Sequence, residues 1–293
     1  MSSRHDSWHL AEGDQLTPEL TAMRLLGGGS SYEAYLAFDE VTFSPVVVKV
    51  VRPGRVDHEA SLRGLRREVA ALTAVNHPVV VRCLRHQLDG DRPHVVLEHI
   101  DGPRLSSLTR RHGPLQEQQY LPLAIDIAAA LHYLRRVGYV HLDIKPSNII
   151  MGAPARLIDL SVARPADQAA ELTRYIGTDQ YMSPEQAAPQ RVGRPGVEGD
   201  VWGLGATLFE AVAGYRPFDD GDPDSDDPMV RFPQLLEPPY ELPDRVPAAV
   251  VKVVYGALEA NPADRPLPHE IATALEPVLA SQPVGKLTFK VRG

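Results

Sequence analysis

Four polar residues have the types and spacing needed to transfer a phosphoryl group. Asp143, Lys145 and Asn148 lie in the short run His141–Asn148, and Asp159 follows eleven positions after the amide. A carboxylate such as Asp143 can orient a hydroxyl nucleophile and accept its proton, and the Lys145 ammonium can neutralise the transferring phosphate. Asn148 and Asp159 offer the hard oxygen ligands that Mg²⁺ prefers. The spacing therefore predicts a phosphoryl-transfer centre that uses a divalent cation.

Apolar residues around this run predict a β-hairpin that positions it. Ile149 and Ile150 follow the amide, a turn is expected over residues 152–154, and Leu157 and Ile158 come next. Two short apolar stretches separated by a glycine- and proline-containing turn are typical of a hairpin.

Further motifs along the chain carry a family resemblance. The two segments resemble the catalytic and metal-binding loops of protein kinases, which read H-R-D-x-K-x-x-N and D-F-G, although here they read HLD and DLS. Other motifs follow in the family's order: a glycine-rich turn at Leu26–Tyr35, a V-A-I-K-like strand at Val46–Lys49, Glu68 in a helix, an A-P-E-like Met182–Glu185, a buried helix from Gly199–Trp202 and an arginine motif at Asn261–Arg265. About 250 of the 293 residues are covered. The chain resembles eukaryotic-like (Hanks-type) serine/threonine protein kinases, and is most similar to soluble bacterial members of the actinobacterial type.

The resemblance implies an α+β, bilobal fold. It assigns residues 21–97 to a small β-sheet lobe with one main helix, 98–102 to a hinge and 103–280 to a larger, mainly helical lobe. Two lobes also suit 293 residues, which exceed the size at which single cores usually stop growing. Residues 1–20 are expected to form a loose N-terminal arm, with a short ordered piece around Trp8 as the alternative. Residues 281–293 are expected to form a tail with a possible strand at Lys286–Val291.

Hydrophobic patterns predict the individual elements. Short apolar stretches bounded by Gly, Pro or Asp predict strands at 36–38, 46–51, 80–84 and 94–97. Apolar residues at helical spacing predict a helix over 61–75. Two longer apolar stripes predict buried helices, one over 120–134 that ends by Gly138 and one over 201–212 that ends at Gly214.

Glu68 and Lys49 are expected to form an ion pair. Glu68 shares the apolar face of the first helix, and Lys49 is a lone charge inside the apolar strand Val46–Val51. Burying either charge alone would be costly, so each needs a partner of opposite sign. The alternative is that both are exposed edge charges whose stems lie along apolar surface.

The resemblance also implies a role for each residue of an ATP site. Lys49, held by Glu68, would contact the α- and β-phosphates, and the backbone N–H groups of Gly27 and Gly29 would cover them. Asn148 and Asp159 would hold Mg²⁺, for which Mn²⁺ could substitute. Asp143 would position the substrate hydroxyl, beside Lys145 and a hydrogen-bonding Thr178.

The adenine pocket is expected at the hinge. Glu98 and Ile100 would contact the base, and Leu97 would close the back of the pocket. Ala34 is smaller and Val47 larger than the family's residues at these positions, an exchange of volume that cores tolerate best. The nucleotide-binding set is completed by Leu26 and Ile150.

Other positions depart from the family pattern. Tyr32 replaces the third glycine of the turn, so its ring is expected to narrow the roof over the phosphates and weaken ATP binding. Leu160 and Ser161 replace the phenylalanine and glycine of D-F-G; Leu160 can still act as an apolar plug, whereas Ser161 limits backbone rotation beside Asp159. Leu142 replaces the arginine that receives an activation-loop phosphate, so activity is expected to need no such phosphate.

Composition narrows the cellular context. The net charge of −8 and the pI near 5.8 argue against a nucleic-acid or anionic-membrane surface. The single cysteine, Cys83, cannot form an internal disulfide, the 11 histidines show no zinc-site spacing, and no apolar run reaches the ~20 residues that span a bilayer. The N-terminus lacks the apolar core of a signal peptide. We therefore expect a soluble, cytoplasmic protein without a membrane span.

The acidic run Asp219–Asp227 contains six aspartates. It lacks the ligand spacing and the terminal glutamate of a calcium loop. The run is expected to be a solvated loop, with a docking surface for a basic substrate as the alternative.

The function implied is ATP- and Mg²⁺-dependent phosphorylation of serine and threonine in proteins, as in bacterial signalling. The alternative is a pseudokinase that binds nucleotide and acts as a scaffold or regulator. The intact set Lys49, Asp143, Asn148 and Asp159 favours the enzyme, whereas Tyr32 and Ser161 favour the scaffold. A small-molecule kinase is disfavoured, because the segment Gly177–Glu185 resembles the family's protein-substrate loop.

Overall fold

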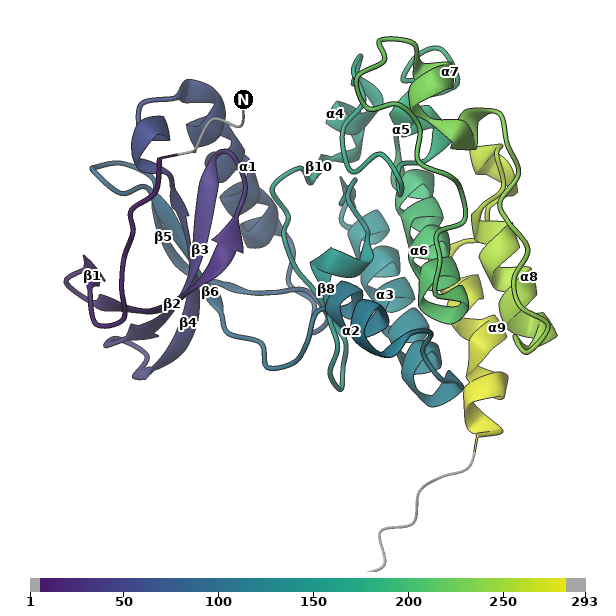
Figure 1. Ribbon diagram of the computed structural model, residues 1–293, viewed down its shortest axis with the longest axis horizontal. Coiled ribbons are helices and arrows are strands. Elements are labelled where there is room, and N and C mark those ends of the chain that lie inside the picture. The colour runs from purple at the N-terminus through teal and green to yellow at the C-terminus, as the bar shows by residue number, and fades with distance from the viewer. Residues whose placement is uncertain (1–5, 283–293) are drawn as a thin grey trace, which may run out of the picture.

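The computed structural model describes residues 6–282 and contains two lobes (Figure 1). The first lobe is built on a six-stranded antiparallel sheet with the strand order β1-β2-β3-β4-β6-β5. Its elements are β1 (Gln15–Thr17), β2 (Leu20–Gly28), β3 (Tyr32–Asp39), β4 (Ser44–Val51), helix α1 (Glu59–Ala74), β5 (Cys83–Gln87) and β6 (His94–Glu98). The bilobal α+β architecture predicted from the sequence is confirmed.

The central strands alternate strictly between two faces. Along β3, alternate residues are buried, and along β4 Val46, Val48 and Val50 are fully buried. Ala34 pairs with Lys49 across the ladder, so both side chains lie on the other face, which looks toward the second lobe. The period of two therefore puts the predicted phosphate- and adenine-contacting residues on one surface.

The N-terminal segment covers the opposite face of the sheet. The Trp8 indole N–H donates to the carbonyl of Val51 at 2.8 Å, and Trp8 and Leu10 pack against the small core formed by that face. The Arg92 guanidinium lies 4.6 Å from the centre of the Trp8 ring. Residues 6–20 are thus fastened to the sheet rather than loose, and the ordered piece includes β1.

The second lobe is mainly helical. Its longer elements are α2 (Leu105–His112), α3 (Glu117–Arg136), α6 (Val197–Ala213), α8 (Ala248–Ala257) and α9 (Pro268–Ala280). The shorter ones are β7 (Tyr139–Val140), β8 (Ile149–Ile150), β9 (Arg156–Leu157), β10 (Arg164–Pro165), α4 (Ala166–Ala170), α5 (Pro184–Ala187) and α7 (Pro228–Arg231). Helix α6 is buried along most of its length and packs between α3 and α8, as expected for a core helix. It ends at Gly214, whose φ of 87° is the left-handed conformation that favours glycine.

One predicted strand is displaced along the chain. A strand was expected over 80–84, but the edge strand β5 begins at Cys83 and runs through the more polar Cys83–Gln87. The backbone of Val79 and Val81 instead bonds to Leu157 on β9 of the second lobe, at 2.7 and 2.9 Å. Val79–Val81 are all buried there. The apolar valines are therefore buried where the two lobes meet. The edge strand β5 has only one neighbouring strand, and such a strand tolerates polar residues.

The remaining predicted elements are present. The strands at 36–38, 46–51 and 94–97 lie in β3, β4 and β6, and the helices lie in α1, α3 and α6. The possible strand at Lys286–Val291 lies outside the described residues. Within residues 6–282, no helix is both long enough and apolar enough to cross a bilayer.

Candidate active site

Lys49 bonds to an acid on each side of the space between the lobes. Its ammonium lies 2.7 Å from Glu68 Oε2 on α1 and 3.0 Å from Asp159 Oδ1 in the second lobe. The Glu68 side chain is 1% exposed, so the expected pair is a buried one and the edge-charge alternative is excluded. Burial alone would lower the pKa of Lys49, but the two carboxylates outweigh burial and raise it. The lysine therefore remains charged.

Asp159 is held in an uncommon backbone conformation. Its φ is 65°, which is rare for a residue with a side chain and occurs often at functional sites. The Ser161 N–H donates to Asp159 Oδ1 at 3.3 Å, and Leu160 is buried in the main core as an apolar plug. Burial would raise the pKa of the Asp159 carboxyl, but Lys49 outweighs burial and holds it below its usual value. The result is an ionised carboxylate in a fixed position.

Asp143, Lys145 and Thr178 form a closed hydrogen-bonded triangle. The Lys145 ammonium lies 2.7 Å from Asp143 Oδ2 and donates to the Thr178 hydroxyl at 2.6 Å. That hydroxyl donates to Asp143 Oδ1 at 2.8 Å. The segment that carries Thr178 is therefore tied directly to the loop that carries the acid and the lysine.

Asn148 is oriented by the same loop. Its Nδ2 donates to the carbonyl of Asp143 at 2.9 Å and to the Asp143 carboxylate at 3.0 Å. These two bonds fix the amide, and its Oδ1 accepts no hydrogen bond from any residue between 6 and 282. An amide oxygen without a donor and the carboxylate of Asp159 are suitable ligands for Mg²⁺. No cluster of three or more His, Cys, Asp or Glu suited to a metal occurs within that range.

A buried aspartate of helix α6 holds the backbone of the loop that carries Asp143. The backbone N–H groups of His141 and Leu142 donate to Asp200 at 2.7 and 2.8 Å, and Asp200 is 3% exposed. Burial raises the pKa of the Asp200 carboxyl to about 7, although the two N–H groups oppose the shift. Leu142 has a φ of 66°, so these bonds stabilise a backbone conformation that leucine rarely adopts. This role of Asp200 was not predicted from the sequence, because an acid in the mostly apolar stretch 197–213 is a signal that Asp200 shares with Glu198 and Glu210.

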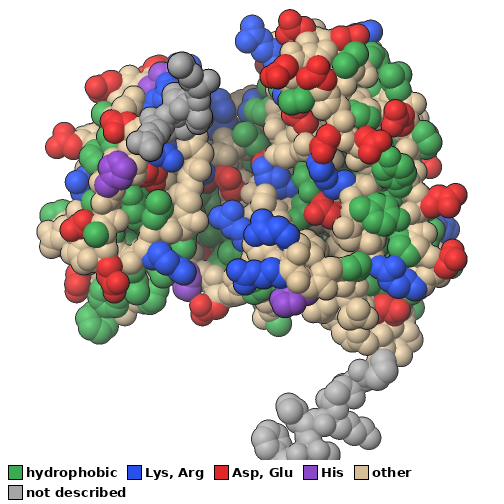
Figure 2. Space-filling model, viewed as in Figure 1, with side chains coloured by type: hydrophobic (Ala, Val, Ile, Leu, Met, Phe, Trp, Pro, Cys, Tyr) green, Lys and Arg blue, Asp and Glu red, His purple; other side chains and the backbone are tan. Residues whose placement is uncertain are grey.

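The hinge leaves backbone groups available for a ligand. The N–H and C=O groups of Ile100 make no hydrogen bond with the rest of residues 6–282. The Glu98 carboxylate is bound by Arg82 and Arg156, so only its backbone can serve a nucleotide. Figure 2 shows that the surface is hollowed between the lobes.

The other predicted nucleotide residues come from elements of both lobes. Ala34, Lys49 and Val47 lie on the same face of the sheet, and Leu97 pairs with Val47 and is buried behind it. The predicted residues of the glycine-rich turn, Leu26, Gly27 and Gly29, lie at the end of β2 and just after it. Ile150 lies on β8 in the second lobe, against Gly102 of the hinge.

Tyr32 adopts a position that the sequence did not predict. Its side chain extends to helix α1, where its hydroxyl donates to the carbonyl of Ser61 at 2.6 Å. The ring lies 5.1 Å from the Lys49 ammonium. The Tyr32 side chain thus contacts the helix that carries Glu68.

The segment between Asp159 and Glu185, here called the activation segment, is held by apolar packing near its middle. Leu142 is buried with Ala169, and Leu172 and Ile176 pack against them. Thr173, between these two residues, is exposed. The residue that replaces the family's arginine therefore contributes to an apolar anchor for the segment.

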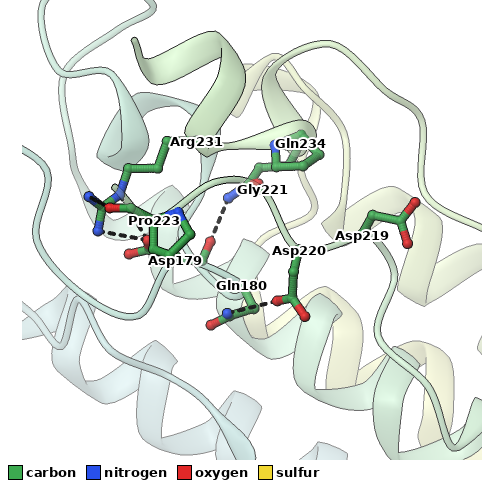
Figure 3. Close-up of a pocket in the computed structure, with 9 residues that line it drawn as sticks. Asp179, Gln180, Asp219, Asp220, Gly221, Pro223, Arg231 and Gln234 are labelled. Atoms are coloured by element: carbon green, nitrogen blue, oxygen red, sulfur yellow. Dashed lines mark hydrogen bonds and ion pairs between the residues drawn. The ribbon is translucent and has the colours of Figure 1, made fainter. Parts of the chain in front are cut away.

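A second contact holds the end of the activation segment (Figure 3). The Arg231 guanidinium lies 2.8 Å from Asp179, and Gln234 Nε2 donates to the carbonyl of Asp179 at 2.7 Å. Gln180 donates to Asp220 at 2.9 Å. The six aspartates of the run Asp219–Asp227 are all exposed, in agreement with a solvated loop.

Comparisons with known proteins agree with this geometry. The protein kinase domain family matches residues 20–274. "Serine/threonine-protein kinase PknB" of Mycobacterium leprae is 31% identical over 253 residues, which cover 82% of this chain and 40% of the relative. The protein of that name from Mycobacterium tuberculosis is 32% identical over 254 residues, with the same coverage. "Serine/threonine-protein kinases drp72" of Corynebacterium efficiens is 32% identical over 258 residues, which cover 85% of this chain and 48% of the relative. The chain thus spans less than half the length of these relatives.

Proposed function

Because this chain belongs to the protein kinase family, we propose that it transfers the γ-phosphoryl group of ATP, with Mg²⁺, to serine and threonine hydroxyls of proteins. The observation that carries the proposal is the position of Lys49, 2.7 Å from Glu68 and 3.0 Å from Asp159. In this reaction class the lysine–glutamate pair and the metal-binding aspartate must be in place together before transfer occurs.

The residues around Asp143 would carry the chemical step. The substrate hydroxyl oxygen forms a bond to the γ-phosphorus, the bond to ADP breaks, and the hydroxyl proton passes to the Asp143 carboxylate. Lys145 would neutralise charge on the transferring group, and Thr178 holds both residues in place through bonds of 2.6 and 2.8 Å. Asn148 and Asp159 would hold Mg²⁺, which supplies further neutralisation of the phosphates. Electrostatic positioning of this kind supplies most of the rate in phosphoryl transfer.

Preference for serine and threonine is supported by Lys145. A lysine two residues after the catalytic aspartate is the arrangement of serine/threonine kinases, and here it bonds to both Asp143 and Thr178. The relatives from Mycobacterium carry the name serine/threonine-protein kinase. A cytoplasmic location is also part of the proposal, and rests on the single cysteine.

A radiolabel-transfer assay tests the activity. The protein is incubated with labelled ATP, Mg²⁺ and a generic basic protein, beside an Asp143→Asn control. We expect incorporation into serine and threonine, and a loss of at least about 100-fold in the control because the proton acceptor is gone. Equal incorporation by both proteins, or none by the native one with folded structure verified, would favour the pseudokinase.

The geometry does not favour that pseudokinase alternative. In the sequence, the two residues that favoured a pseudokinase were Tyr32 and Ser161. The Tyr32 hydroxyl is bound to α1, and the Ser161 N–H supports the Asp159 carboxylate. Both residues therefore stabilise the arrangement that transfer requires.

The activation segment is proposed to be active without phosphate. Leu142 packs with Leu172 and Ile176, so the segment is anchored without a charge pair. Thr173 and Tyr175 are the plausible phosphate acceptors, with Ser161 a weaker one. The arginines that could instead bind such a phosphate are Arg174 and Arg164. The Nη2 atom of Arg164 is buried without a hydrogen-bond acceptor within residues 6–282.

Thr173→Ala is therefore expected to retain activity. After all phosphate has been removed with a phosphatase, the initial rate on a separate protein substrate should stay within about threefold of the native protein, because apolar packing still orders the segment. A fall of more than about tenfold, which corresponds to ~1.4 kcal/mol of barrier, would show that Arg164 or Arg174 receives a phosphate.

A further inference from the structure

Tyr32 connects the glycine-rich turn to the helix that carries Glu68. It is the first residue of β3, immediately after the turn, and its backbone carbonyl accepts a hydrogen bond from Gly29 at 3.1 Å. Its hydroxyl donates to the carbonyl of Ser61 in the first turns of α1, at 2.6 Å. The side chain is partly buried and packs against the main core. One residue thus bonds to both the turn and the helix.

Helix α1 contains a glycine that makes room for this contact. A Cβ atom added at Gly64 would lie 2.3 Å from the Tyr32 hydroxyl and 3.6 Å from the ring carbon that bears it. Glycine is unfavourable inside a helix, so a glycine in this position needs a packing reason. The approach of the tyrosine hydroxyl supplies that reason, and Tyr32 and Gly64 form a complementary pair.

The contact lies one helical turn before Glu68. Residues four apart occupy the same face of a helix, so Gly64 and Glu68 both face the sheet. Glu68 reaches Lys49 at 2.7 Å, and the Tyr32 ring lies 5.1 Å from the same ammonium. Anything that moves this part of α1 away from the sheet would separate the ion pair.

We propose that Tyr32 is a positioning residue that fastens helix α1 to the sheet through Ser61 and Gly64 and so keeps Glu68 paired with Lys49 without an activation-segment phosphate. The inference rests on the proposed function, since the pair matters through phosphoryl transfer. It also complements Leu142: apolar packing holds the activation segment, and the tyrosine holds the helix. The competing explanation is that Tyr32 only fills space, in which case phenylalanine would serve equally well.

The test compares four proteins: native, Tyr32→Phe, Gly64→Ala and the double variant. Tyr32→Phe keeps the ring but loses the bond to Ser61, so kcat should fall about three- to tenfold, the range for one hydrogen bond, with an unchanged KM for the protein substrate. Gly64→Ala places a methyl group against the hydroxyl and should cause at least the same loss. In the double variant the hydroxyl is absent and the nearest ring carbon is at ordinary contact distance, so adding Gly64→Ala to Tyr32→Phe should cost nothing further.

Two further measurements separate positioning from packing. Hydrogen exchange of the backbone amides of α1 should be faster in Tyr32→Phe and Gly64→Ala than in the native protein, and unchanged in α6. In a Glu68→Gln background, Tyr32→Phe should change kcat by less than twofold, because the residue acts through Glu68. The proposal would be overturned if Tyr32→Phe had the kcat and the exchange rates of the native protein. It would also be overturned if Gly64→Ala lowered kcat equally in the native protein and in Tyr32→Phe. The exchange measurement needs no kinase activity, so it decides the inference even if the radiolabel assay contradicts the proposed function.

Discussion

Asp159→Asn and Lys49→Met are each expected to lower phosphoryl transfer by about 100- to 1000-fold or more. Asp159→Asn removes the carboxylate proposed to hold Mg²⁺, and Lys49→Met removes the cation proposed to contact the α- and β-phosphates. Loss of one preorganised electrostatic contact in a water-poor site typically has an effect of this size. Initial rates with labelled ATP, at saturating Mg²⁺ and equal protein concentration, measure it. Native turnover in either folded variant would contradict the assignment.

The two variants should differ in stability, which gives a matched control. In Asp159→Asn, Lys49 keeps its 2.7 Å contact with Glu68, so the melting temperature should stay close to that of the native protein. In Lys49→Met, the buried Glu68 carboxylate loses its nearest cation, and breaking a buried pair by removing one partner is destabilising. Lys49→Met with Glu68→Gln should recover the lost stability and remain inactive. If the double variant is as unstable as Lys49→Met, the loss comes from packing rather than from the unpaired charge.

The sequence predicted the Lys49–Glu68 pair because each residue carried its own signal. A lysine inside an apolar strand and a glutamate on an apolar helix face both need a partner, and each is the partner that the other lacks. The triangle of Asp143, Lys145 and Thr178 was only partly readable in this way. Two of its members are close in sequence, whereas Thr178 entered through the family resemblance alone.

Other contacts could not be predicted, because they join residues whose separate signals are ordinary. Asp200 bonds to two backbone N–H groups some sixty positions earlier in the chain. Nothing in the pattern of α6 identifies those partners. Tyr32 was expected to lie over the phosphates, since the sequence gives the residue type but not the direction of its side chain. That direction depends on Gly64, a helix glycine whose purpose becomes visible only beside the tyrosine.

The predicted strand over 80–84 shows a related limit. An apolar run indicates burial, and Val79–Val81 are buried as expected. The apolar pattern does not identify the element against which the run packs. Here the backbone of the run bonds to β9 of the second lobe rather than to the sheet. Short apolar runs are consistent with more than one element for this reason.

Arg265→Ala is expected to destabilise the protein by about 3–5 kcal/mol, the usual loss when one partner of a buried ion pair is removed. The Arg265 side chain is 0% and that of Glu185 1% exposed, and two bonds of 2.6 and 2.9 Å join the guanidinium to the carboxylate. Arg265 also donates to the carbonyls of Glu259, Glu198 and Ala260. Truncation leaves the carboxylate and these carbonyls without that donor, so the effect should lie at the upper end of the range.

A thermal or urea unfolding experiment measures the free energy of unfolding of Arg265→Ala, and a variant of an exposed ion pair serves as the control. Arg63→Ala removes the partner of Glu59 on the surface of α1, where both side chains are more than half exposed, and should cost less than about 1 kcal/mol. Arg265→Lys should recover only part of the stability, because a single ammonium cannot reproduce the two parallel bonds of the guanidinium. Since Glu185 ends the activation segment and Arg265 precedes α9, the pair connects the proposed substrate-binding segment to the core of the second lobe. If Arg265→Ala unfolds within about 1 kcal/mol of the native protein, the pair does not hold that segment in place.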